Sequence, residues 1–252
     1  MKEVIHQRLT ARLRDKPIPA TVPGSLPVLF FGDLLSARIA TISINPSRQE
    51  CLSREGEELD GVRRRFETFR SLEAADRASL SDEQTKQAID RIHGYFDHDE
   101  SVYSWFNGLI RVIEGMGYSY SGHSAAHLDI VQEATDPTWS KLKTKDRGQA
   151  DIALQRDLQF LQWQIESFPL RAIVCTSAIV QREVAKMLPV RTVHKGALAR
   201  VQWTASIAET PRGPIGVAGW NLTLAHAGLT REEQRELGVI LIDCLDKIGY
   251  AP

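Results

Sequence analysis

The sequence predicts an α/β fold, namely a three-layer αβα sandwich around a mostly parallel central sheet. Short apolar, β-branched runs alternate with long stretches of helical periodicity, which is typical of parallel α/β sheets. Several of these runs are nearly continuous in apolar residues, as expected for strands buried on both faces. The chain has 252 residues, of which 42% are hydrophobic and 25% charged, an ordinary globular composition. We expect a single domain over residues 1–252, with a helical insertion at about residues 60–116.

The opening segment predicts a helix that ends near Asp15, and the proline-rich stretch after it cannot form regular structure. Residues 37–45 form a nearly continuous apolar run that Pro46 ends, so we expect a buried strand there. Apolar residues recur at helical spacing over 59–69, and Ser81-Asp-Glu-Gln is a capping signature for a further helix. The later elements continue the alternation: a strand at 127–131, a helix at 146–168, a strand at 171–176, a helix at 178–188, short strands at 190–193 and 198–203, a last strand at 221–225 and a last helix at 231–248.

Ligands of such sheets bind at the carboxyl ends of the strands, so we look for chemistry there. Pro46 fixes its own φ and lacks an N–H donor, so the backbone groups of Ile44 and Asn45 can face a ligand instead of continuing a ladder. Each polar residue at a strand end also has an ordinary structural explanation, as a turn residue, a helix cap or a structural histidine. The predicted strand ends carry these polar residues: Asn45, Asp129, Thr176-Ser177 and His226.

Three of these segments, ISINPS (residues 42–47), HLDIV (127–131) and LAHAGL (224–229), together resemble the uracil-DNA glycosylase superfamily. In that superfamily the first motif has the form GINPG, GMNPG or GQDPY. A middle strand carries a base-reading Asn in a pattern like TNLV, and the last motif begins with the His of HPS. The resemblance covers these short stretches and the order of strands and helices, and the first motif is its most specific part.

The resemblance implies a DNA-repair enzyme that flips deoxyuridine out of DNA, hydrolyses its N-glycosidic bond and leaves an abasic site. By position, Asn45 corresponds to the residue that orients the attacking water. Because an Asn is not a strong base, water positioning and leaving-group stabilisation must supply most of the rate. The backbone N–H near Ile44 and the side chain of His226 would donate to uracil O2 as negative charge develops there. The expected partner is DNA containing uracil, the protein is expected to be a monomer without metal or cofactor, and lyase activity is not expected because no Lys lies in the motifs.

The resemblance also implies roles in holding the base and the duplex. Phe66 is the candidate for the aromatic that stacks on the flipped base, although the family's Phe lies closer to its first motif. A core Phe is the alternative. Ser47, within the first motif, is counted with the substrate-binding residues. Leu229 corresponds to the residue that wedges into the duplex, where extruding a base costs a few kcal/mol, and a surface Leu is the alternative.

The sequence departs from the family pattern in three ways. Ser43 and Ser47 stand where relatives often have Gly, and no Tyr follows two residues after Asn45. In relatives that Tyr blocks the thymine methyl group, so exclusion of thymine is not predicted. Asp129 replaces the base-reading Asn, and an ionised carboxylate accepts from uracil N3–H but repels O4. Therefore either burial protonates Asp129, another donor serves O4, or the preferred base is not uracil. Finally, HAGLT lacks the Pro-Ser of HPS.

The net charge is −1, but basic residues cluster at 141–147 and 182–200, while acids concentrate at 50–60 and 97–100. Locally basic loops on a near-neutral protein can hold phosphates transiently. Lys143 and Arg182 are the candidate DNA contacts from these clusters. Charge runs of this kind are also typical of ordinary solvated surfaces.

Other functions remain in view. His123, His127 and Asp129 could bind a metal if they lay on a helix. In a strand, however, positions four apart are separated by about 13 Å, and the Glu of HExxH is missing. A nucleophilic hydrolase lacks a GxSxG elbow, and Cys175 lies in a predicted strand. A catalytically degraded nucleotide- or nucleic-acid-binding α/β domain stays open as the main alternative.

Several classes are disfavoured by composition. The three cysteines are widely separated, which argues against a disulfide framework, a CxxC zinc site and a four-thiolate cluster. No Gly-rich phosphate loop is present. No apolar run approaches the ~20 residues that a membrane span needs. Because the N-terminus lacks a signal-type apolar stretch, we expect a cytoplasmic protein.

Overall fold

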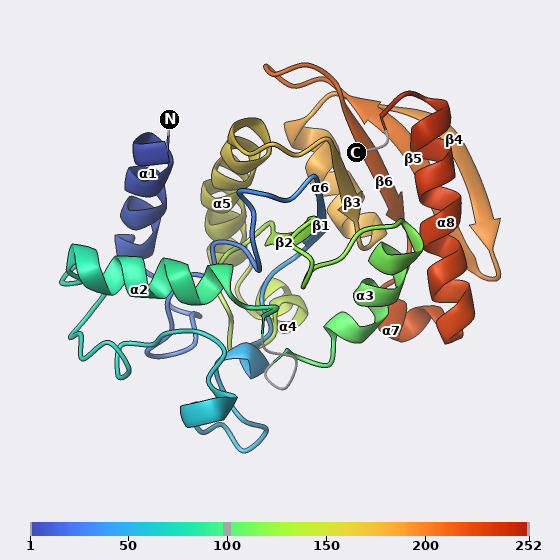
Figure 1. The fold of residues 1–252 in the computed structure, drawn as a ribbon. Helices are drawn as coiled ribbons and strands as arrows, with labels where there is room; N and C mark the ends of the chain where they lie inside the picture. Colours follow the sequence, from blue (N-terminus) through green and yellow to red (C-terminus); the bar gives the residue numbers. More distant parts are fainter. Residues whose placement is uncertain (1, 98–101, 251–252) are drawn as a thin grey trace. The chain divides into compact units, whose positions relative to one another are not determined.

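The computed structural model describes residues 2–97 and 102–250 (Figure 1). Its Cα positions group into two compact units. The first unit comprises residues 1–31, 44–103 and 129–159, and the second comprises 32–43, 104–128 and 160–252. The expectation of a single domain stays a prediction. Within the described residues, no helix has the length and apolar character needed to cross a membrane.

A six-stranded mixed sheet lies almost wholly in the second unit, with strand order β2-β1-β3-β6-β5-β4. Strand β1 pairs parallel to β3 and β3 pairs parallel to β6, whereas β5 pairs antiparallel to both β6 and β4. Every residue of β1, β3 and β6 is buried, as expected for parallel strands covered on both faces. The strands span β1 Ile39–Ser43, β2 Ala125–Asp129, β3 Ala172–Cys175, β4 Val190–Leu198, β5 Val201–Ala208 and β6 Ile215–Trp220.

Helices cover both faces of this sheet. Gly216 and Gly219 of β6 are an odd number of residues apart, so they face opposite sides of the sheet. A Cβ on Gly216 would lie 2.9 Å from Leu245 of α8 (Arg231–Lys247), and one on Gly219 would lie 3.1 Å from Gln181 of α6 (Ala178–Met187). Helices α8 and α6 therefore pack on opposite faces, and both approach β6 closely because it has glycine there. This arrangement confirms the predicted αβα layering.

Helix α3 (Phe106–Gly115) lies against α8 by direct backbone contact. A Cβ on Gly238 would lie only 2.0 Å from the carbonyl oxygen of Val112, and one on Gly115 only 2.1 Å from that of Arg235. Both glycines are thus required for the approach of the two helices. The short α7 (Leu224–Ala227) precedes α8 and also contacts α3.

The first unit contains helices and connecting turns. Helix α2 begins at a capping box in which Ser81 accepts from Gln84 N and Gln84 caps in return, as the sequence predicts. The elements of the first unit are α1 Lys2–Arg14, the 3-10 turns η1 Arg48–Glu50 and η2 Gly61–Arg63, α2 Asp82–His93, α4 Trp139–Lys145, and α5 Arg147–Ser167. Helix α5 continues into the second unit.

Three element predictions are wrong. The segment 59–69 is not helical: Gly61 has a φ of 57°, and only the short η2 forms, with the Asp60 side chain accepting at its start. The apolar spacing there reflects burial of a turn-rich segment. The short strands predicted at 190–193 and 198–203 are the longer hairpin β4–β5. The last strand is β6, whose glycines weaken the strand pattern. The segment 221–225 is not a strand, and its residues 224 and 225 belong to α7 instead.

Candidate functional site

Asn45 follows β1 and lies in the first unit, half-buried, with its amide held in one orientation. Its Nδ2 donates to the carbonyl oxygens of Pro46 at 3.0 Å and Glu133 at 3.2 Å, and to Thr135 Oγ1 at 3.3 Å. The three acceptors around Nδ2 fix which end of the amide is nitrogen. Within the described part of the chain no group donates to Oδ1. Asn45 therefore presents a fixed acceptor that can bind a water molecule.

The neighbouring backbone of the first motif is engaged. The carbonyl of Ile44 accepts from Val131 N at 2.9 Å, so it is not released from the ladder to face a ligand, as was expected of the backbone groups there. Donation to uracil O2 by the backbone N–H near Ile44 stays a prediction. Ser47 accepts from Gln49 N at 3.2 Å and caps η1. The local role of Ser47 is thus to start the turn that follows Asn45.

That turn ends in Glu50, a buried acid that the sequence reasoning missed. Glu50 is 2% exposed, and the hydroxyl of Tyr95 donates to its Oε2 at 2.9 Å. Burial raises the pKa of Glu50 from 4.5 to about 8, against the lowering effects of Arg65 and Tyr95, and the Asp129 carboxylate raises it further. Strongly shifted carboxyl groups cluster at functional sites. The sequence places Glu50 at the start of an acidic run, where it cannot be distinguished from an exposed acid.

Asp129 ends β2 and is 2% exposed. Because its carboxylate contributes to the raised pKa of Glu50, the two acids interact electrostatically within the first unit. A neutral carboxyl group can donate a hydrogen bond, whereas an ionised one only accepts. Glu50 is therefore a candidate for the donor that an ionised Asp129 lacks.

Phe66 is a core residue of the first unit. It is 5% exposed, its ring stacks on that of Tyr95 with centroids 5.2 Å apart, and it meets Phe31 edge-on at 5.3 Å. The expectation of a helical position is wrong, because Phe66 lies among turns. The packing agrees with the alternative of a core Phe, and stacking of Phe66 on a flipped base stays a prediction.

His226 lies in α7 of the second unit and is exposed. Its Nδ1 hydrogen-bonds Thr223 Oγ1 at 2.7 Å, and Arg200 donates to the carbonyl oxygens of His226 and Ala227. These contacts hold both the ring and the backbone of the short helix. Leu229 is 8% exposed, so the alternative of a surface Leu is wrong, while its role as a wedge stays a prediction.

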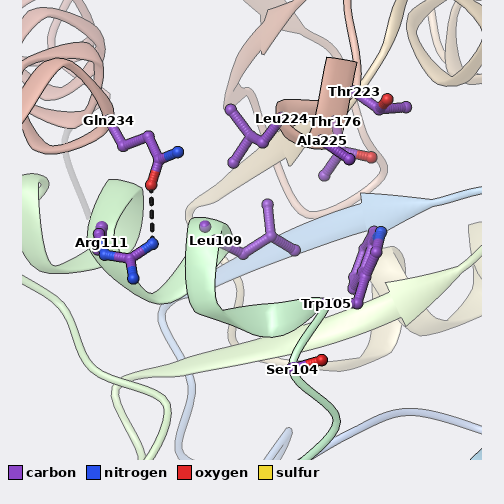
Figure 2. Close-up of a pocket in the computed structure, with 10 residues that line it drawn as sticks. Ser104, Trp105, Leu109, Arg111, Thr176, Thr223, Leu224, Ala225 and Gln234 are labelled. Atoms are coloured by element: carbon purple, nitrogen blue, oxygen red, sulfur yellow. Dashed lines mark hydrogen bonds between the residues drawn. The ribbon is translucent and has the colours of Figure 1, made fainter. Parts of the chain in front are cut away.

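A pocket of about 190 Å³ lies wholly within the second unit, beside this helix (Figure 2). Trp105 and Leu109 line it from the start of α3, and Leu224 and Ala225 line it from α7. Thr176, at the end of β3, lies at one end of the pocket (Figure 2). The sequence predicts Thr176 at a strand end, but no signal in the sequence distinguishes Trp105.

The two candidate DNA contacts lie in different units. Lys143 is exposed on α4 of the first unit, among other exposed basic side chains. Arg182 is exposed on α6 of the second unit, and its Nε lies 3.5 Å from Oε1 of Glu183. Asn45 and His226 likewise belong to different units, so the expectation that they face one pocket stays a prediction.

The metal-site alternative depends on His127, which lies in β2 as the sequence predicts. Its Nδ1 hydrogen-bonds Thr41 Oγ1 at 2.7 Å, and its ring packs edge-on against Phe106. Over residues 2–97 and 102–250, no group of three or more His, Cys, Asp or Glu side chains is arranged to hold a metal ion. Cys175 is buried in β3, and burial raises its thiol pKa to about 12, so it is a poor nucleophile.

Neither the family models nor the curated proteins that were searched contain a match to this chain.

Proposed function

We propose that the protein is a monofunctional DNA glycosylase that hydrolyses the N-glycosidic bond of deoxyuridine and leaves an abasic site. The observation that carries this proposal is the locked amide of Asn45. Its Nδ2 is held by protein acceptors at 3.0–3.3 Å, so its Oδ1 is left to accept a proton of the attacking water. Orientation of a nucleophile can supply a large share of a rate enhancement without a strong base.

In this reaction the bond between C1′ of the sugar and N1 of uracil breaks, and its electron pair leaves with the base. The oxygen of the water bonds to C1′, and the released proton ends on solvent or on the departing uracil. Charge develops on uracil O2, where a hydrogen-bond donor lowers the barrier most. His226 is the proposed donor, and the Thr223 contact to its Nδ1 at 2.7 Å leaves Nε2 for this purpose.

Base recognition is assigned to the Asp129 and Glu50 pair. Asp129 would accept from uracil N3–H, and Glu50, which is mostly neutral at pH 7 because burial raises its pKa to about 8, would donate to O4. Together the two acids then match the donor and acceptor that a single Asn side chain offers. This removes the difficulty that an isolated carboxylate poses for uracil.

Uracil release is expected to decline above about pH 8, where Glu50 loses its proton. The sign follows from the raised pKa: below it the carboxyl group donates, and above it a second negative charge faces O4 and Asp129. Arg65 and the Tyr95 hydroxyl also face Glu50 and limit the shift. In the Glu50→Gln variant the amide still donates but does not titrate, so the decline should disappear while the rate at pH 7 stays similar. Single-turnover rates from pH 6 to 10 would measure this, and an unchanged profile in the variant would refute the role.

The proposal is tested with a single-stranded oligonucleotide that contains one deoxyuridine, followed by alkaline cleavage. A matched oligonucleotide with thymidine at the same position is the control. We expect cleavage at the uracil position only after incubation with the protein. If neither this strand nor strands with hypoxanthine or xanthine become alkali-labile, the alternative of a binding domain without catalysis is favoured.

A further inference from the structure

The pocket of the second unit has the form of a slot between two helical segments (Figure 2). Trp105 and Leu109 form one side, and Leu224 and Ala225 form the other. The slot narrows at Gly108, where a Cβ would lie only 3.1 Å from Leu224 Cδ1. A narrow space with apolar walls favours a flat ring over a branched or spherical ligand.

Trp105 has the properties of a stacking platform. It is 38% exposed although it lines the pocket, and its ring is held edge-on by Phe106 at 5.1 Å and His127 at 5.5 Å. A fixed, partly exposed aromatic ring is well suited to stack on a nucleobase, whatever its sequence context.

The two ends of the slot are polar and differ in character. At one end, Thr176 Oγ1 donates to the Ile42 carbonyl at 3.0 Å and accepts from Ser43 Oγ at 2.7 Å, so one lone pair is left to accept from a ligand. At the other end, Arg111 Nη1 donates to Gln234 Oε1 at 2.9 Å (Figure 2). A guanidinium has further N–H donors for a carbonyl oxygen. The pocket therefore offers an acceptor for a ring N–H and a cationic donor for a ring C=O.

We propose that this pocket binds a single-ring nucleobase that carries carbonyl groups, with Trp105 stacked on the ring. The volume of about 190 Å³ is below the ~300–1,000 Å³ typical of pockets for drug-sized ligands, which favours one ring over two. The inference rests on the proposed function for the choice of uracil as the ligand. It goes further by assigning a second base site, in addition to the Asp129 and Glu50 pair, to residues of α3, β3 and α7 that the family resemblance does not name.

The test is binding of free uracil to the intact protein, measured by ligand-observed NMR and by quenching of tryptophan fluorescence. Deoxyuridine monophosphate is a second arm, which separates recognition of the free base from that of a nucleotide, and adenine is the two-ring control. We expect saturable binding of uracil and weaker binding of adenine. Trp105→Ala should weaken uracil binding by roughly tenfold or more, since stacking on an aromatic side chain is worth about that factor.

Two further variants keep the test decisive. Ala225 is exposed, so Ala225→Phe should fill the slot and abolish binding without loss of the folded circular dichroism spectrum. Trp139→Ala, in α4 of the first unit, is the matched control and should bind uracil normally. Absence of saturable binding to the wild type, or equal binding to Trp105→Ala and Ala225→Phe, would overturn the inference. Binding with no release of uracil from DNA would instead remove the proposed function and leave this pocket standing.

Discussion

The Glu133→Gln substitution is expected to lower the free energy of unfolding by about 3–5 kcal/mol, the typical cost of breaking a buried ion pair by removing one partner. Glu133 is fully buried in the first unit, where Nη1 and Nη2 of Arg77 donate to its two carboxylate oxygens at 2.8 Å each. Arg156 and Arg12 also contact Glu133, at 3.1 and 3.5 Å. A neutral amide at this position would remove the carboxylate that pairs with Arg77, while Arg12 and Arg156 would still pair with Asp157.

The protonation of Glu133 gives the same stabilisation a pH dependence. Burial alone would raise the pKa of this carboxyl group, but Arg77, Arg12 and Arg156 lower it from 4.5 to about 2. The contribution is therefore fully present above about pH 4.5 and is lost as the pH falls towards 2. Urea unfolding followed by circular dichroism measures both effects. Asp243→Asn, which removes an exposed acid paired with Lys247, is the matched control and should change stability far less. Equal stability of the two variants would contradict the stabilising role of the ion pairs around Glu133.

The Asn45→Ala substitution is expected to slow uracil release by about 100-fold or more at saturating DNA, the effect typical of losing a group that acts in the transition state. The reason is that the variant keeps the fold but loses the oriented acceptor for water. Binding of uracil-containing DNA should change much less, so kcat rather than KM carries the loss. Single-turnover kinetics and a binding titration separate the two.

Asn107, which is exposed on α3, provides the control for this prediction. Asn107→Ala should release uracil at nearly the wild-type rate and unfold at nearly the same temperature. A wild-type rate in Asn45→Ala would show that the locked amide is not part of the reaction, whatever its hydrogen bonds.

Glu133 connects the buried ion pairs of the first unit to the candidate site. Glu133 binds arginines with its side chain, while its backbone carbonyl accepts from Asn45 Nδ2 at 3.2 Å. The ion pairs thus fix the segment that orients the proposed water-binding amide. Glu133→Gln should accordingly reduce uracil release even where the protein is still folded.

The α/β fold was predictable because its central strands have a distinctive sequence pattern. The runs around 39–43 and 172–175 are apolar and β-branched, and burial on both faces requires that pattern. Strand β6 was not predicted, because Gly216 and Gly219, which permit close helix packing, are not typical of strands. The helix expected at 59–69 failed because apolar spacing cannot distinguish a buried turn-rich segment from an amphipathic helix.

The site was only partly predictable. Asn45 stands out through the abrupt stop at Pro46, which is a local feature of the sequence. Glu50 and Glu133 do not, because an acid is identified as buried only by partners far along the chain, such as Tyr95 and Arg77. Trp105 owes its pocket to α7, which lies more than a hundred residues away in sequence. Long-range contacts of this kind produce no periodic pattern in the sequence.

Direct measurement of free uracil tests the central claim most simply. A uracil-containing single strand is incubated with the wild-type protein, Asn45→Ala and His226→Ala, and the released base is quantified by chromatography. The account predicts one free uracil for each abasic site formed by the wild type, and slow release by both variants. No free uracil from the wild type, or the same amount from all three proteins, would contradict it.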